Sequence, residues 1–241
     1  MSKTEIYEKE FELHLRDIDK NNKMRLSSYL NFMQEIGGLH SKEYGYGLND
    51  EPITHKAWIV ISWDLEIFKR PVWNEKVLVR SWIGKIDKLY HYRDYEILDS
   101  NHQLVAKAVA KWVMIDTITK KIQKLDENHL KEFPIVQRDD FNNSIEKVNM
   151  KFDVNRLNQI YEYKVVKRDV DTNNHMNNII YLDLALEGLE DGDIENISSI
   201  QIHYKTECKY NEEIVFMKDD ENKIYVLDKN KEKLHTLVIL K

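Results

Sequence analysis

The sequence predicts an α+β protein in which two similar units follow one another, each combining one helix with an antiparallel sheet. The main observation is an internal repeat: residues 16–35 align without gaps to residues 168–187, and nine of the twenty aligned residues are identical. In each copy, a strand pattern precedes the repeat, and a helix and several β-patterned segments follow it. The period is too long for a solenoid, so it indicates a duplicated domain.

Composition excludes several classes of protein. The chain has 241 residues, 42% of them hydrophobic, with a net charge of -6 from interspersed acidic and basic residues. This mixture argues against a nucleic-acid binder, and without a long apolar run we expect no stable membrane insertion. The polar first residues predict neither a signal peptide nor a transit peptide. Cys208 is the only cysteine, which excludes an internal disulfide and fits a cytoplasmic protein.

The first unit begins with a strand in which Phe11, Leu13 and Leu15 alternate with polar residues. A helix should follow the repeat, because apolar residues recur there at helical spacing: Leu26, Tyr29, Leu30, Met33, Ile36 and Leu39. We expect Gly37 and Gly38 to disturb the end of this helix. Segments rich in Val, Ile, Trp and Tyr then predict antiparallel strands at 57–68, 76–86, 89–98 and 103–115, with a hairpin at Asp99-Ser100-Asn101.

The second unit repeats this order. We expect a first domain at 1–130, a connection with one or two short helices at 131–158, and a second domain at 159–241. The second domain should hold a strand at 160–166, a helix through Tyr181 and Leu182, and strands at 197–205, 213–217, 223–227 and 234–240. A second echo, residues 73–79 against 210–216, aligns Arg70 with Glu207.

Residues able to do chemistry are concentrated in the second copy of the repeat. Asp171, Asn173 and His175 lie just before its helix, followed by Asn177 and Asn178. In the first copy, Lys23 stands in place of His175, whereas Asp19 and Asn21 are kept. Asp and Asn also favour turns and helix caps, so a purely structural role is the alternative.

Together with a second motif, these residues resemble a known family. The chain is similar to the acyl-acyl carrier protein thioesterases, of the bacterial kind that resemble the plant plastid enzymes. The family motif Asp-x-Asn-x-His-(Val or Met)-Asn-Asn is met by residues 171–178, and a second signature by Tyr204-Lys205-Thr206-Glu207-Cys208. The resemblance implies a tandem double hotdog, in which each domain wraps a curved antiparallel sheet around a long helix.

The resemblance also implies the activity, which is hydrolysis of the thioester between a fatty acyl chain and the phosphopantetheine arm of acyl carrier protein. It assigns catalysis to Asp171, Asn173, His175 and Glu207 in the second domain, and acyl-chain binding to the first. It implies no cofactor. Tyr29, Phe32 and Met33 are the candidates for lining an acyl pocket, with ordinary core packing as the alternative.

The chemistry of these side chains suits hydrolysis. An imidazole titrates near neutral pH and can act as general base or acid. If the fold brings Glu207 near Asp171, one carboxyl of the pair becomes a better base; water attack and a carboxylate nucleophile both remain open. Amides at the start of the helix near Asn178 could hold the oxyanion.

Cys208 presents a separate choice. A Cys–His pair can be a nucleophile system, but a lone cysteine is usually a small buried hydrophobe, and we expect Glu207 to raise its pKa. We therefore predict a structural role for Cys208 and a strand position for His203. We expect no zinc or other metal site, because no His or Cys lies at ligand spacing from His175.

The predicted partner is an acidic acyl carrier protein, for which basic residues are candidates, with ordinary solvated surface residues as the alternative: Lys164, Lys167, Arg168, Lys205 and Lys209. Competing functions are an acyl-CoA thioesterase of the same fold and a non-catalytic acyl-binding or sensor protein. A DNA-binding regulator would need a basic helical segment, which the sequence does not show. We expect one active site per chain, and either a monomer built as a pseudo-dimer or a homodimer.

Overall fold

A computed structural model describes residues 4–124, 133–141 and 144–241. The chain divides into two compact units, Met1–Ile145 and Glu146–Lys241, called unit 1 and unit 2 below. This division falls inside the segment 131–158 that the sequence predicts to be a connection. None of the helices in the described part is long and apolar enough to cross a membrane.

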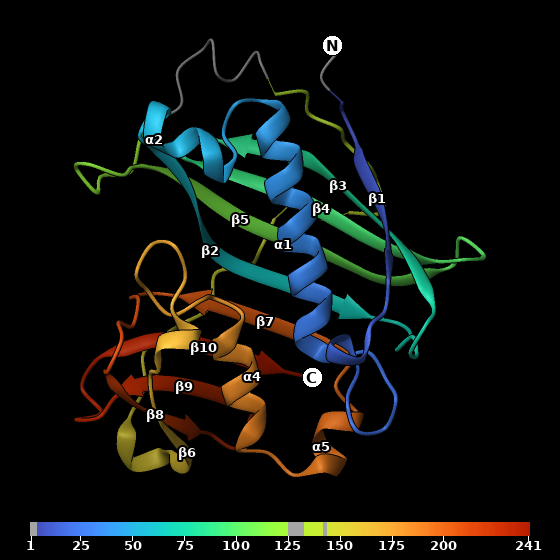
Figure 1. Ribbon diagram of the computed structural model, residues 1–241. Helices are drawn as coiled ribbons and strands as arrows, with labels where there is room; N and C mark the ends of the chain where they lie inside the picture. Colours follow the sequence, from blue (N-terminus) through green and yellow to red (C-terminus); the bar gives the residue numbers. More distant parts are fainter. Residues whose placement is uncertain (1–3, 125–132, 142–143) are drawn as a thin grey trace. The chain divides into compact units, whose positions relative to one another are not determined.

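The described residues of unit 1 form a five-stranded antiparallel sheet with one long helix (Figure 1). The strands β1 (Tyr7–Glu12), β2 (Lys56–Ile67), β3 (Lys76–Asp87), β4 (Tyr90–Asp99) and β5 (Leu104–Asp116) pair in the order β1-β3-β4-β5-β2. The last four coincide closely with the predicted strands. The first strand ends at Glu12, and Leu15, expected to belong to it, begins a short 3-10 turn.

Helix α1 (Leu26–Glu43) crosses one face of this sheet and contacts β1 and β3. The expectation that Gly37 and Gly38 disturb its end was wrong, because the helix continues through them to Glu43. Gly37 has a packing reason: a Cβ there would lie 2.8 Å from the hydroxyl of Tyr95 on β4. The glycine therefore lets the helix approach the sheet closely. A four-residue helix, α2 (Glu51–Thr54), precedes β2.

Unit 2 has the same plan with a shorter helix. Its strands β6 (Asn158–Lys164), β7 (Ser199–Tyr204), β8 (Glu213–Lys218), β9 (Lys223–Asp228) and β10 (Leu234–Leu240) pair antiparallel in the order β7-β10-β9-β8-β6. Helix α4 (Ile180–Glu187) has eight residues, whereas α1 has 18.

Helix α4 ends at Glu187, and Gly188 is its C-cap. A Cβ at Gly188 would lie 2.9 Å from the side chain of Ile160 on β6, so the chain approaches the sheet closely where the helix ends. The acidic helix α5 (Asp191–Glu195) follows after a break. The predicted long helix of the second domain is therefore a short one.

The connecting segment packs on both units. Phe133 stacks on Tyr44 and Phe141 packs edge-on against Trp82, both in unit 1. From Val148 to Leu157, apolar side chains cover a buried cluster of β8, β9 and β10 in unit 2. Of the short helices predicted here, the described part shows a 3-10 turn at Val154–Arg156. Residues 125–132 and 142–143 lie outside the described residues.

Candidate active site

The candidate site is built on the tight loop that precedes α4. The amide of Asp171 donates to the carbonyl of His175 at 2.9 Å, and the Asp171 carboxylate accepts from the amides of Asn173 (2.8 Å) and His175 (3.4 Å). Asn174 takes a left-handed conformation with φ 62°, which asparagine tolerates. Asp171 therefore closes the loop with its own side chain.

The first copy of the repeat folds into the same loop. Asp19 donates its amide to Lys23 O at 2.8 Å, its carboxylate accepts from the amides of Asn21 (2.8 Å) and Lys23 (3.0 Å), and Asn22 has φ 60°. The Asp and Asn residues that both copies share thus have a common task in shaping the backbone. The imidazole of His175 is what unit 2 adds.

A second segment of unit 2, which connects β7 to β8, lies beside this loop. The amide of Met176 donates to the carbonyl of Cys208 at 2.8 Å, which holds residues 207 and 208 beside the loop. His175 Nδ1 consequently lies 3.0 Å from Glu207 Oε2. The contact has the distance of an ion pair but not the alignment of a hydrogen bond, since Nδ1 has no aligned acceptor. The side chain of His175 is 23% exposed and that of Glu207 51% exposed, so solvent reaches the pair.

The other two predicted residues are placed differently. The Asn173 side chain is exposed and forms no hydrogen bond with another described residue. Asp171 is tied to its own loop by the amides of Asn173 and His175. The carboxylate in contact with the imidazole is that of Glu207. The pairing of Asp171 with Glu207 stays a prediction.

At the start of α4, the amide of Asn178 is available for a ligand. The side-chain oxygen of Asn177 accepts from the amide of Ile179 at 2.9 Å, and its carbonyl accepts from the amide of Ile180 at 3.1 Å. The Asn178 carbonyl accepts from the hydroxyl of Tyr204 at 2.9 Å. Within the described ranges, the amide of Asn178 has no acceptor, and it lies three residues beyond His175.

Comparison with known proteins adds to this geometry. Residues 4–133 match the model of the acyl-ACP thioesterase N-terminal domain, and residues 153–239 match that of the C-terminal domain. The chain belongs to the acyl-ACP thioesterase family. A curated relative is the chloroplastic oleoyl-acyl carrier protein thioesterase of Coriandrum sativum, 23% identical over 223 residues that cover 86% of this chain and 60% of the relative. Oleoyl-acyl carrier protein thioesterase 1 of Arabidopsis thaliana is 25% identical over 220 residues, or 84% of this chain and 60% of that protein.

This chain thus spans about 60% of the length of these curated relatives. Solved structures agree on the fold. An acyl-ACP thioesterase from Bacteroides thetaiotaomicron superposes with a TM-score of 0.86 at 20% identity, covering 100% of both chains. The 12:0-ACP thioesterase from Umbellularia californica gives 0.80 at 18% identity, covering 97% of this chain and 92% of that one. The predicted family and the α+β tandem double hotdog are therefore confirmed.

In this acyl-ACP thioesterase family member, Cys208 is buried and is held by a tyrosine. It is fully buried, and its amide donates to the Tyr181 hydroxyl at 2.9 Å. Burial raises the pKa of the Cys208 thiol to about 12; the acid that adds to this shift is Glu212, not Glu207 as the sequence suggested. A protonated buried thiol is a poor nucleophile. The contact of Tyr181 was not predicted from the sequence. The repeat offered a signal for it, since Tyr29 occupies the position of Tyr181 in the first copy.

The equivalent place in unit 1 holds an ion pair. Met24 donates to the carbonyl of Pro71 at 2.7 Å, as Met176 does to Cys208, so Arg70 takes the place of Glu207. The Arg70 guanidinium lies 2.7 Å from Asp19 Oδ2 and also donates to Met24 O. Burial acts to raise the pKa of Asp19, but the amides of Lys23 and Asn21 and the charge of Arg70 outweigh it and lower the pKa. Unit 1 therefore has neither the imidazole nor the second carboxylate at this place.

The predicted acyl-pocket residues are all buried in unit 1. Tyr29 donates its hydroxyl to the carbonyl of Lys69 at 2.7 Å, Phe32 stacks on Phe11 with ring centroids 4.8 Å apart, and Met33 is fully buried. These contacts are those of ordinary core packing. Their role in acyl binding stays a prediction.

Proposed function

We propose that this chain hydrolyses the thioester of a fatty acyl chain carried by acyl carrier protein, releasing a free fatty acid and the carrier thiol. Membership of the acyl-ACP thioesterase family supports the reaction class. The observation that carries the proposal is the 3.0 Å contact between His175 and Glu207 in unit 2. Unit 1 keeps the loop but replaces both residues.

In the proposed mechanism, Glu207 orients His175. A carboxylate beside Nδ1 favours the tautomer with the proton on Nδ1, which leaves the lone pair of Nε2 for a water molecule. His175 takes a proton from that water as it attacks the thioester carbonyl. When the tetrahedral intermediate collapses, the C–S bond breaks and the same proton passes to the leaving sulfur. Water and thioester thus give carboxylic acid and thiol, with His175 restored.

The remaining candidates have supporting roles. The amide of Asn178 is the proposed donor to the oxyanion of the intermediate. Asp171 holds the loop that carries His175, and Asn173, exposed beside it, is proposed to contact the water or the substrate. The alternative in which a carboxylate attacks the carbonyl directly is distinguished by trapping: it requires an acyl anhydride on Glu207 or Asp171.

A basic surface next to the loop is the proposed docking place of the carrier protein. Lys164, Lys167 and Arg168 line one surface hollow together with Tyr210 and Asn211. All three cations are exposed, and they directly precede the candidate catalytic loop in the sequence. An acidic carrier protein would be attracted to this surface, and salt would weaken the attraction.

The test compares matched acyl-ACP and acyl-CoA substrates and identifies the free fatty acids that accumulate in an expressing cell. We expect a higher kcat/KM for acyl-ACP. Replacing Lys167 and Arg168 by Glu should lower kcat/KM for acyl-ACP at low salt and leave hydrolysis of a small acyl thioester unchanged. Lys151→Glu, an exposed lysine of unit 2 outside the hollow, is the control. Equal rates with both carriers would favour the acyl-CoA alternative, and binding of acyl-ACP without turnover would favour the sensor.

A further inference from the structure

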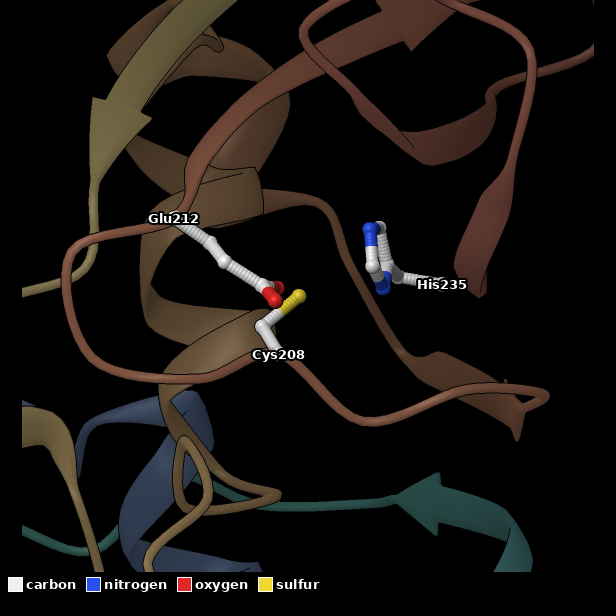
Figure 2. Close-up of side chains that lie close together, drawn as sticks. All are labelled: Cys208, Glu212 and His235. Carbon is white, nitrogen blue, oxygen red and sulfur yellow. The ribbon is translucent and has the colours of Figure 1, made fainter.

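A second group of chemically active side chains lies in unit 2 and combines two residues of the segment that carries Glu207 with one residue of β10. Cys208 Sγ, a carboxylate oxygen of Glu212 and a ring nitrogen of His235 all lie within 4.8 Å of one another (Figure 2). They come from the turn after β7, the residue before β8, and β10. Cys208 and His235 are buried, and Glu212 is half-buried.

The orientation of His235 is fixed by Thr206. His235 Nδ1 lies 3.2 Å from the carbonyl oxygen of Thr206 and 3.3 Å from its hydroxyl. A carbonyl can only accept, so Nδ1 carries the proton and the lone pair is on Nε2. A neutral imidazole whose other nitrogen donates to a backbone carbonyl is the usual arrangement of a histidine that binds a metal.

We propose that Cys208, Glu212 and His235 form a binding site for a zinc ion. One thiolate, one imidazole and one carboxylate are ligand types that zinc accepts, and three protein ligands leave a fourth position for water. When the zinc–sulfur bond forms, the thiol proton is released to solvent. The charges of thiolate and carboxylate then balance the two charges of the ion.

The surroundings allow the ion to enter. Glu212 and His235 line a surface hollow together with Asp228 and Lys233. Besides Glu212, the charged residues that line this hollow are therefore two carboxylates, Glu213 and Asp228, and two exposed ammonium groups, Lys229 and Lys233. The spacing of residues around His175 carries no information on this site, because His235 lies far from Cys208 along the chain and the pairing of β10 with β7 brings it close.

The test uses the full chain, treated with a chelator and titrated with Co²⁺. Cobalt adopts zinc-like tetrahedral sites and reports a thiolate ligand by a charge-transfer absorption band. We expect one Co²⁺ per chain, a thiolate band, and displacement of cobalt by Zn²⁺. Cys208→Ser should remove the band. Glu212→Gln should weaken binding at least ~10-fold, because loss of even an indirect partner of a metal ligand costs ~10–100-fold.

Two controls keep the outcomes distinct. Glu212 is half-buried, so Glu212→Gln should keep the fold, as checked by its melting curve in the absence of metal. His203→Asn changes another buried strand histidine, outside the cluster, and should bind cobalt as the wild type does. Zinc should raise the melting temperature of the wild type and of His203→Asn by several degrees, and that of Glu212→Gln much less. Absence of a thiolate band in the wild type would overturn the proposal. Unchanged cobalt affinity in Glu212→Gln would also overturn it and would indicate adventitious surface binding.

Discussion

Replacing Asp19 by Ala should destabilise the protein without abolishing turnover. The Asp19 carboxylate closes the unit 1 loop through the amides of Asn21 and Lys23 and pairs with Arg70 at 2.7 Å. The side chains of Arg70 and Asp19 are only 11% and 21% exposed, so their interaction is partly shielded from solvent. Arg70 would keep its two hydrogen bonds to Met24 O. Losing hydrogen bonds to a charged group, discounted for this exposure, gives a cost of ~2–3 kcal/mol.

For a chain of this size, that cost corresponds to a fall in melting temperature of ~5–10 °C. Asp19→Asn is the matched variant, since it keeps an acceptor for the loop amides but removes the charge that pairs with Arg70. Its melting temperature should lie between those of the wild type and Asp19→Ala. The assay is thermal unfolding followed by circular dichroism, together with turnover of an acyl thioester below the transition.

The pH dependence of this effect has a defined sign. The pKa of Asp19 is lowered in the folded protein, so its carboxylate stabilises the fold above the ordinary carboxyl pKa. This stabilisation is lost as the pH falls through the lowered pKa, and the gap between wild type and Asp19→Ala should close toward acid. A gap that is constant with pH, or turnover lost as in Asp171→Ala at unchanged melting temperature, would refute the reasoning.

Three further changes test other parts of the account. Cys208→Ala should keep most of the turnover, because burial holds the thiol protonated; an acyl group trapped on Cys208 in a quenched reaction would contradict this. Gly188→Ala should lower stability by ~1–3 kcal/mol, because the new Cβ would lie 2.9 Å from the Ile160 side chain, and Ile160→Val should recover part of the loss in a double mutant. Tyr181→Phe removes the acceptor of the buried Cys208 amide and should lower the free energy of unfolding, measured in urea, by ~1–3 kcal/mol. An unchanged free energy of unfolding would contradict this and would mean that water replaces the hydroxyl.

Most strands could be predicted from the sequence because each has a strong local pattern. The segment 103–115 is rich in β-branched and aromatic residues, and β5 occupies nearly the same residues. The length of α4 could not be predicted in this way, since the repeat suggested a helix like α1. Gly188 and the acidic residues after it act only at the end of the helix, where a pattern of apolar residues gives little information.

The candidate site likewise has one part that the sequence could predict and one part that it could not. The loop at 168–178 could be predicted, because its Asp and Asn residues act on neighbouring amides and appear twice in the chain. The approach of Glu207 to His175 depends on the hydrogen bond between Met176 and Cys208, which joins segments far apart in sequence. His235 beside Cys208 depends in turn on strand pairing. Contacts of this kind have no local signal in one sequence, although the echo of 73–79 in 210–216 did align Arg70 with Glu207 correctly.

The central claim is that His175 and Glu207 of unit 2 act together on the thioester. It is tested most directly by measuring kcat for acyl-ACP hydrolysis in His175→Ala, Glu207→Ala, Asp171→Ala and the His175/Glu207 double variant, each shown to be folded by its melting curve. General acid–base groups contribute ~100-fold or more, so His175→Ala should lower kcat by about that factor. Glu207→Ala and Asp171→Ala should lower kcat as well, because Glu207 orients His175 and Asp171 holds its loop. Because the two residues act as a unit, the double variant should be scarcely slower than His175→Ala. Folded single variants that all retain kcat within about tenfold of the wild type would contradict the claim.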